Sequence, residues 1–160
     1  MKMLKKLKRE KSIMRTEKGV AIIAYKEIRG SKRFLILKRT KNWEGWELPK
    51  GHLEEDDYAK TVEIELEEEA SIEKDEIISV DETDETLEWS YEDEGEKVNR
   101  EYNVFIVKIK EEASVDTTEN PSDEHETGFF MKKEDVESLL TYDNQKELIA
   151  NYTEILKNKT

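Results

Sequence analysis

The segment from Tyr58 to Ser71 constrains the fold more than any other part of the chain. Its apolar residues recur at helical spacing, at Tyr58, Val62, Leu66 and Ala70. This stripe predicts one amphipathic helix that buries a single face. Asp56 and Asp57 at its start suit the N-cap position and the positive end of the helix dipole. A helix with one apolar face needs another layer of structure to cover that face, so the rest of the chain must supply it.

Short apolar runs on both sides of this helix predict a sheet. The expected strands are Gly19–Tyr25, Phe34–Leu37, Ile77–Val80, Thr86–Tyr91, Tyr102–Ile109 and Gly128–Met131. Two more helices are expected at Lys133–Leu140 and Tyr142–Lys157, after a polar loop at Glu111–Asp123. The sequence therefore predicts a mixed α+β fold without internal repeats.

Length and composition limit the classes that remain. A chain of 160 residues favours one domain, which we place at 15–160 behind a basic arm at 1–14. The absence of cysteine excludes disulfide scaffolds, cysteine-ligated zinc and thiol catalysis. No apolar stretch approaches the ~18 residues of a membrane span, and the basic start lacks the apolar centre of a signal peptide. We expect a cytoplasmic protein with no membrane partner.

Charge is distributed unevenly along the chain, whose net charge is −13. Residues 1–18 hold eight Lys or Arg against two Glu, whereas residues 54–101 hold 22 Asp or Glu against four Lys or Arg. An acidic surface repels nucleic acid, so such a partner is expected only through the basic arm. Most of these carboxylates are expected to form a solvated surface, but a dense cluster can also bind a hard divalent cation.

Glu65, Glu68 and Glu69 form the most informative group of carboxylates. Their spacing of i, i+3 and i+4 puts them on one helix face, within ~5–6 Å of one another. They follow the residues Leu48-Pro49-Lys50-Gly51-His52. The segment Asn42–Gly51 cannot be helical throughout, because Pro49 favours an extended Leu48 and two glycines interrupt it. Magnesium would offset the repulsion among the three carboxylates. An over-acidic solvated helix face is the alternative.

Together, the loop and the helix resemble the Nudix box, G-x5-E-x7-R-E-U-x-E-E-x-G-U, the signature of the Nudix hydrolase family. The resemblance extends from about Arg15 to the C-terminal helix, and it implies the Nudix fold, a mixed β-sheet sandwiched between helices (α/β/α). The Pro-Lys-Gly-His lead-in is most similar to the diadenosine tetraphosphate (Ap4A) hydrolase branch. Trp46 before the proline and the downstream Glu124-His125-Glu126 are also similar to that branch.

Three positions depart from the box. Only four residues separate Gly51 from the first acidic position, which is Asp56 rather than Glu. Ile64 occupies the arginine position, and Ser71 the glycine position. We expect Ile64 to be partly exposed on the flank of the helix, and Ser71 to be strained if the helix ends in a left-handed residue.

The resemblance implies a set of site residues. Mg²⁺, or Mn²⁺, would be held by Glu65, Glu68 and Glu69, and Glu68 or Glu124 would take the proton of the attacking water. The residues expected to contact the substrate are Trp46, Lys50, Gly51, His52, Tyr91, Lys97, Arg100 and Phe129. For the aromatic residues among them, a place in the core is the alternative.

The expected reaction is hydrolysis of a nucleoside polyphosphate, with asymmetric cleavage of Ap4A or a related dinucleoside polyphosphate to ATP and AMP as the first hypothesis. An RNA 5′-pyrophosphohydrolase that contacts RNA through its basic arm is the second. The third is a non-catalytic nucleotide-binding Nudix module, suggested by Ile64 and Ser71. Retention of all three glutamates argues against this last hypothesis.

Overall fold

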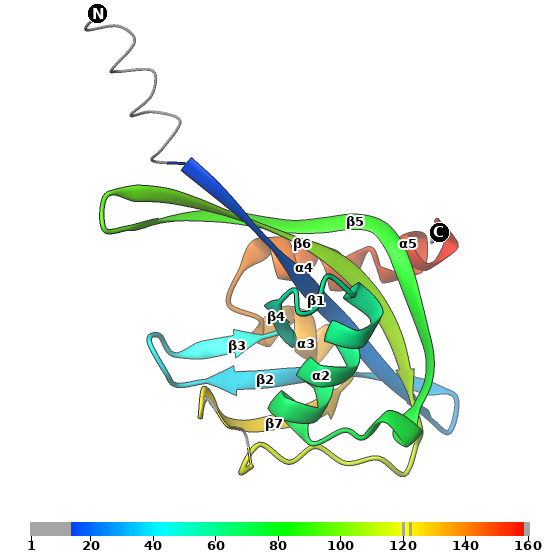
Figure 1. Cartoon of the computed structure of the whole chain (residues 1–160). Helices are drawn as coiled ribbons and strands as arrows, with labels where there is room; N and C mark the ends of the chain where they lie inside the picture. The colour runs from blue at the N-terminus through cyan, green and yellow to red at the C-terminus, as the bar shows by residue number, and fades with distance from the viewer. Residues whose placement is uncertain (1–13, 120, 122, 159–160) are drawn as a thin grey trace, which may run out of the picture.

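The computed structural model describes residues 14–119, 121 and 123–158 (Figure 1). Its strands are β1 (Met14–Ile28), β2 (Ser31–Arg39), β3 (Gly45–Glu47), β4 (Lys50–His52), β5 (Ile77–Asp93), β6 (Glu96–Ile109) and β7 (His125–Met131). Its helices are α2 (Tyr58–Ala70), the short 3-10 helix η1 (Lys74–Glu76), α3 (Lys133–Leu139), α4 (Asp143–Ala150) and α5 (Tyr152–Lys157). The predicted basic arm lies outside the described residues except for Met14, which begins β1.

Strand β1 is the centre of the sheet. Along one edge it pairs in parallel with β6, from Met14 opposite Lys97 to Tyr25 opposite Lys108. Along the other edge it pairs with β4 and then with β2, both antiparallel. β5 covers the outer edge of β6, while β3 and β7 both pair with β2. The sheet is therefore mixed, and the short strand β4 holds the Lys50–His52 loop against its middle.

Alternate residues of β1 point to opposite faces of the sheet, and each face has its own core. Val20 and Ile22 pack with α2, whereas Ala21 and Ile23 pack with α3, α4 and α5. In Figure 1, α2 lies in front of the sheet and the C-terminal helices lie behind it. This confirms the α/β/α sandwich that the family resemblance implies.

Helix α2 begins and ends close to the predicted positions. The Asp57 side chain accepts a hydrogen bond from the Lys60 amide at 3.0 Å, and it caps the first turn. At the other end, Ser71 has a left-handed backbone with φ 57°, and its amide donates to the Glu67 carbonyl. The position that glycine occupies in the box is therefore where this helix ends. In this chain Ser71 occupies that position and adopts the left-handed conformation.

The structure differs from the expected elements in several places. β5 is one strand where two were expected, because it stays paired with β6 across the polar residues between the two apolar runs, with a register irregularity between Glu82 and Thr86. The last predicted helix is divided into α4 and α5 at Asn151, whose φ of −98° and ψ of 13° depart from helical geometry. β3 and β4 were not predicted, since three residues carry no period that a sequence pattern can show.

No helix among the described residues is both long enough and apolar enough to cross a bilayer. The cytoplasmic location stays a prediction.

Candidate active site

The structure brings most of the predicted site residues to one cavity of about 390 Å³, between β4, α2 and the segment before β7. Eight of them line it: Lys50, Gly51, His52, Glu65, Glu68, Glu69, Arg100 and Glu124. They come from four separate parts of the chain. Three of the eight are the box glutamates, which enter the cavity from one face of α2.

The three box glutamates differ in burial. Glu65 and Glu69 are 9% and 6% exposed, whereas Glu68 lies in the open. Gly51 makes this burial possible, because a Cβ atom at that position would lie 2.1 Å from the Glu65 carboxyl carbon. Only a residue without a side chain lets β4 approach the helix so closely.

On the acidic wall of the cavity, Glu65, Glu68 and Glu69 place like charges close together. Burial, with Glu68 and Glu54 nearby, raises the pKa of Glu65 to about 8. Burial and the adjacent Glu65 and Glu47 raise the pKa of Glu69 well above its ordinary value. Among the described residues, no donor reaches the buried Oε2 atom of Glu69. A cluster of buried carboxylates with an unsatisfied oxygen fits a hard divalent cation such as Mg²⁺.

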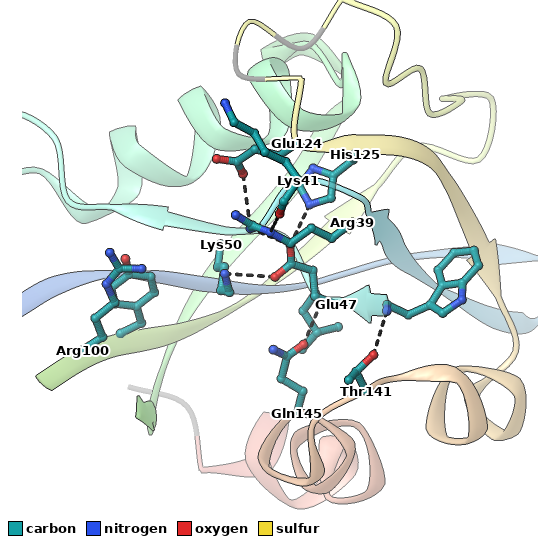
Figure 2. A network of polar contacts seen from close by, with 12 residues as sticks. Arg39, Lys41, Glu47, Lys50, Arg100, Glu124, His125, Thr141 and Gln145 are labelled. Carbon is teal, nitrogen blue, oxygen red and sulfur yellow. Dashed lines mark hydrogen bonds and ion pairs between the residues drawn. The ribbon is translucent and has the colours of Figure 1, made fainter. Parts of the chain in front are cut away.

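A second feature, absent from the sequence predictions, is a buried carboxylate surrounded by cations (Figure 2). Glu47 is 1% exposed. It accepts from His125 Nε2 at 2.7 Å and from Arg39 Nη1 at 3.1 Å, and Lys50 Nζ lies 3.0 Å from its other oxygen. Burial alone would raise the pKa of Glu47, yet the hydrogen bond from His125 and the charges of Lys50 and Arg39 lower it to about 2.

The backbone on both sides of Glu47 is anchored to the helical layer. The Trp46 amide donates to Thr141 Oγ1 at 2.9 Å, and the Leu48 amide donates to the buried Gln145 Oε1 at 2.8 Å. Figure 2 shows both contacts below the glutamate. These contacts with Thr141 and Gln145 fix the backbone around Glu47, while its carboxylate orients Lys50 beside the cavity.

Arg39 connects this buried cluster to the predicted catalytic loop. Its Nη1 atom lies 3.4 Å from Glu124 Oε2 as well as close to Glu47. Neither Arg39 nor Glu47 stands in a pattern that sequence reasoning can distinguish from a solvated charge. Their importance depends on contacts between segments that are far apart in the chain.

A second cavity, of about 420 Å³, adjoins the first and has an aromatic wall. Its aromatic wall consists of Trp43, Trp89, Tyr91 and Tyr142, of which only Tyr91 was predicted. Arg39, Lys50 and Arg100 line both cavities. Arg100 is fixed there, because its Nη2 donates to the Tyr91 hydroxyl at 3.0 Å and its Nε to Glu17 at 3.0 Å.

His52 sits between the cationic and acidic parts of the first cavity. Its Nδ1 lies 3.2 Å from the Tyr102 hydroxyl, and its Nε2 lies 3.4 Å from Arg100 Nη2. Burial and the Arg100 charge lower the pKa of His52. Both ring nitrogens are therefore engaged with neighbouring side chains.

Three predicted substrate residues do not line either cavity. Trp46 packs against the core on the side of α3, α4 and α5, and its ring centroid is 6.1 Å from that of Phe129. Lys97 is exposed near the turn of the long β5–β6 hairpin. Substrate contact by Trp46, Lys97 or Phe129 stays a prediction without support from their placement.

A cavity lined with carboxylates beside the Pro-Lys-Gly loop, on an α/β/α sandwich, agrees with the family resemblance. Residues 17–152 match the model of the NUDIX domain. The chain therefore belongs to the Nudix family and is a Nudix hydrolase. No curated protein matches the chain.

Several solved structures share this fold. A C. elegans Ap4A hydrolase binary complex has a TM-score of 0.67 and 22% identity, over 88% of this chain and 98% of that one. The NUDIX domain of Shewanella oneidensis NrtR, complexed with ADP ribose, has a TM-score of 0.68 and 14% identity, over 91% and 92%. The E. coli dihydroneopterin triphosphate pyrophosphohydrolase has a TM-score of 0.66 and 16% identity, over 88% and 95%.

Proposed function

We propose that the chain hydrolyses a nucleoside polyphosphate in a reaction that depends on a divalent cation. The substrate that we favour is Ap4A or a related dinucleoside polyphosphate, cleaved asymmetrically to ATP and AMP. One observation carries the proposal: the acidic cavity and the aromatic cavity share the cations Arg39, Lys50 and Arg100.

The aromatic cavity and the shared cations follow one another in the same order as the base and the phosphates of a nucleotide. Trp89 and Tyr91 offer ring faces on which a nucleobase can stack. The three shared cations lie where the phosphate chain would cross from one cavity to the other, and arginine pairs well with phosphate. Each volume falls within the ~300–1,000 Å³ of typical ligand pockets. The similarity in fold to the C. elegans Ap4A hydrolase adds weight to a dinucleotide.

Glu65, Glu68 and Glu69 are the residues that would hold Mg²⁺ or Mn²⁺. When bound, the cation would neutralise phosphate oxygens and make a bound water more acidic. Of the two candidate bases, Glu68 is exposed at the cavity, whereas Glu124 is paired with Arg39. We therefore assign proton transfer from the attacking water to Glu68. Lys50, oriented by Glu47, would bind a phosphate oxygen as a point charge.

The test is product analysis with Ap4A, ADP-ribose and 5′-triphosphate RNA as separate substrates in Mg²⁺. We expect ATP and AMP from Ap4A, and Glu68→Gln should lower kcat by at least about 100-fold. Glu67→Gln is the matched control, because Glu67 is an exposed neighbour on the same helix that does not line the cavity. Turnover of RNA alone would favour the second hypothesis, and no turnover of any substrate would contradict the proposal.

A further inference from the structure

We propose that Glu47 is a positioning residue: it holds the Lys50 ammonium away from the box glutamates, so that these carboxylates stay free to bind a divalent cation. This inference rests on the proposed function in one respect, namely that a cation binds at Glu65, Glu68 and Glu69. It goes beyond that function, because Glu47 lines neither cavity and is not among the predicted site residues.

The first observation is that Lys50 stands close to the box glutamates. It lines the acidic cavity together with them, and its side chain is 16% exposed. Burial and neighbouring carboxylates raise the pKa of Glu65 and of Glu69, whereas the charge of Lys50 lowers both. The ammonium is therefore near enough to act on both groups. A lysine in this place would pair with them unless another carboxylate held it.

The second observation is that the ammonium lies at Glu47 and not at Glu69. Lys50 Nζ is 3.0 Å from Glu47 Oε1 (Figure 2), and among the described residues Glu47 is the one carboxylate within ion-pair distance of it. The buried Oε2 atom of Glu69 has no hydrogen-bond partner within the described part of the chain. A buried carboxylate oxygen of this kind costs free energy unless a proton or a cation compensates it. The fold thus gives the ammonium to Glu47 and leaves the Glu69 oxygen available to a divalent cation.

The third observation is that Glu47 cannot turn away from Lys50. Its Oε2 atom accepts from His125 Nε2 at 2.7 Å and from Arg39 Nη1 at 3.1 Å. Its other oxygen, Oε1, is buried, and the Lys50 ammonium supplies the charge that compensates it. Because two donors fix Oε2, Oε1 stays directed at Lys50.

Arg39 also pairs with Glu47, but it does not depend on Glu47 alone. Its Nε donates to the Lys41 carbonyl at 2.9 Å, and its Nη1 lies 3.4 Å from Glu124 Oε2. Lys50 has a flexible four-carbon stem, and its ion-pair partner is Glu47. Loss of the Glu47 charge would therefore release Lys50 and leave Arg39 in place.

A released Lys50 would compensate Glu69 in place of the metal. The ammonium and the divalent cation would then compete for the same buried oxygen, and the affinity for the cation would fall. Removal of the lysine side chain would remove the competitor and restore the affinity. A role for Glu47 that is only structural does not predict this restoration.

The test is a double-mutant cycle on the full chain, with Mn²⁺ alone as the probe and calorimetric titration as the measurement. Glu47→Gln should weaken Mn²⁺ binding by about tenfold, because an uncharged amide cannot hold the ammonium. Glu47→Gln combined with Lys50→Met should restore the affinity to within about threefold of that of the unmodified chain. Glu44→Gln is the matched control: it removes one carboxylate charge from an exposed residue that lines neither cavity, and it should leave Mn²⁺ binding unchanged.

The possible outcomes separate the two proposals. Equal weakening in Glu47→Gln and in the double variant would overturn this inference, and so would unchanged binding in Glu47→Gln; the proposed function would stand in both cases. Failure of Mn²⁺ to bind the unmodified chain would contradict the inference and the proposed function together. If Glu47→Gln does not fold, Lys50→Met alone decides. A gain in Mn²⁺ affinity of about tenfold or more would show that Lys50 already occupies the carboxylates and would overturn the inference, whereas a smaller change would support it.

Discussion

At position 51 the chain has no room for a side chain. The backbone of β4 lies directly against the buried Glu65 carboxylate, so the smallest substituent on Gly51 would occupy its place. A residue of β4 without a side chain thereby determines where the Glu65 carboxylate, a proposed ligand of the cation, can lie. The same contact explains why glycine and glutamate belong to one motif although fourteen positions separate them.

Gly51→Ala should displace Glu65 and weaken Mg²⁺ binding by about tenfold, with a parallel loss of kcat. Gly128→Ala is the matched control, since a Cβ atom there would lie 2.7 Å from the Leu37 side chain, outside the cavity. It should lower the melting temperature without changing Mg²⁺ affinity. Calorimetric titration with Mg²⁺ and a thermal melt of both variants make the comparison. Unchanged Mg²⁺ binding in Gly51→Ala would contradict the packing argument.

At the scale of the element, α2 ends at a position whose left-handed backbone conformation glycine adopts more easily than serine. Ser71 has φ 57°, and a left-handed conformation costs an L-residue about 1–2 kcal/mol. Ser71→Gly should therefore raise the free energy of unfolding by about 1 kcal/mol, measured by urea denaturation. Ser138→Gly, inside α3, should lower it instead. A decrease with Ser71→Gly would show that the serine side chain stabilises this turn.

Ile64, which occupies the arginine position of the box, is the other departure on the same helix. The structure leaves it half-buried and outside both core clusters, as the helical spacing predicts. Ile64→Arg should therefore be tolerated, with Ap4A hydrolysis unchanged or increased because a guanidinium would stand near the acidic face. Steady-state hydrolysis in Mg²⁺ and a thermal melt are the measurements. A large fall in melting temperature would show that Ile64 is part of the core.

The sequence predicts elements well where a pattern is long and local. The apolar stripe and the aspartate cap determine α2 almost to the residue, and the box glutamates follow from it. The rest of the candidate site depends on contacts that no local pattern encodes. Glu47 and Arg39 have the appearance of ordinary charged residues in the sequence, and only the fold buries them together. Trp89 and Tyr142 line one cavity although they are far apart in the chain.

At the scale of the whole molecule, the buried carboxylates link stability to pH and to cations. Glu65 has a pKa of about 8 in the fold, against about 4.3 for an unfolded glutamate, so the folded state binds more protons between these values. Stability therefore falls as pH rises through this range. Glu47, with a pKa of about 2, acts in the opposite direction, because its contribution is lost as pH falls from about 4 towards 2.

We expect the melting temperature in EDTA to fall from about pH 5 to about pH 8, and millimolar Mg²⁺ to raise it more at pH 8 than at pH 6. Glu65→Gln should reduce both effects, because it removes the group that titrates. The measurements are thermal melts in EDTA and in Mg²⁺ at each pH, at matched ionic strength. A melting temperature in EDTA that stays level or rises with pH would contradict this prediction.

The parallel pairing of β1 with β6 has a consequence for the synthesis of the protein on the ribosome. Gly19 lies opposite Tyr102, so the first strand made must wait for residues more than eighty positions later. At ~5–20 residues per second, a ribosome leaves the run Gly19–Tyr25 without its parallel neighbour for several seconds. During that interval a β-rich apolar segment is open to pairing with other chains. Synthesis speed and chaperone supply should therefore govern the soluble yield more than the stability of the finished enzyme does.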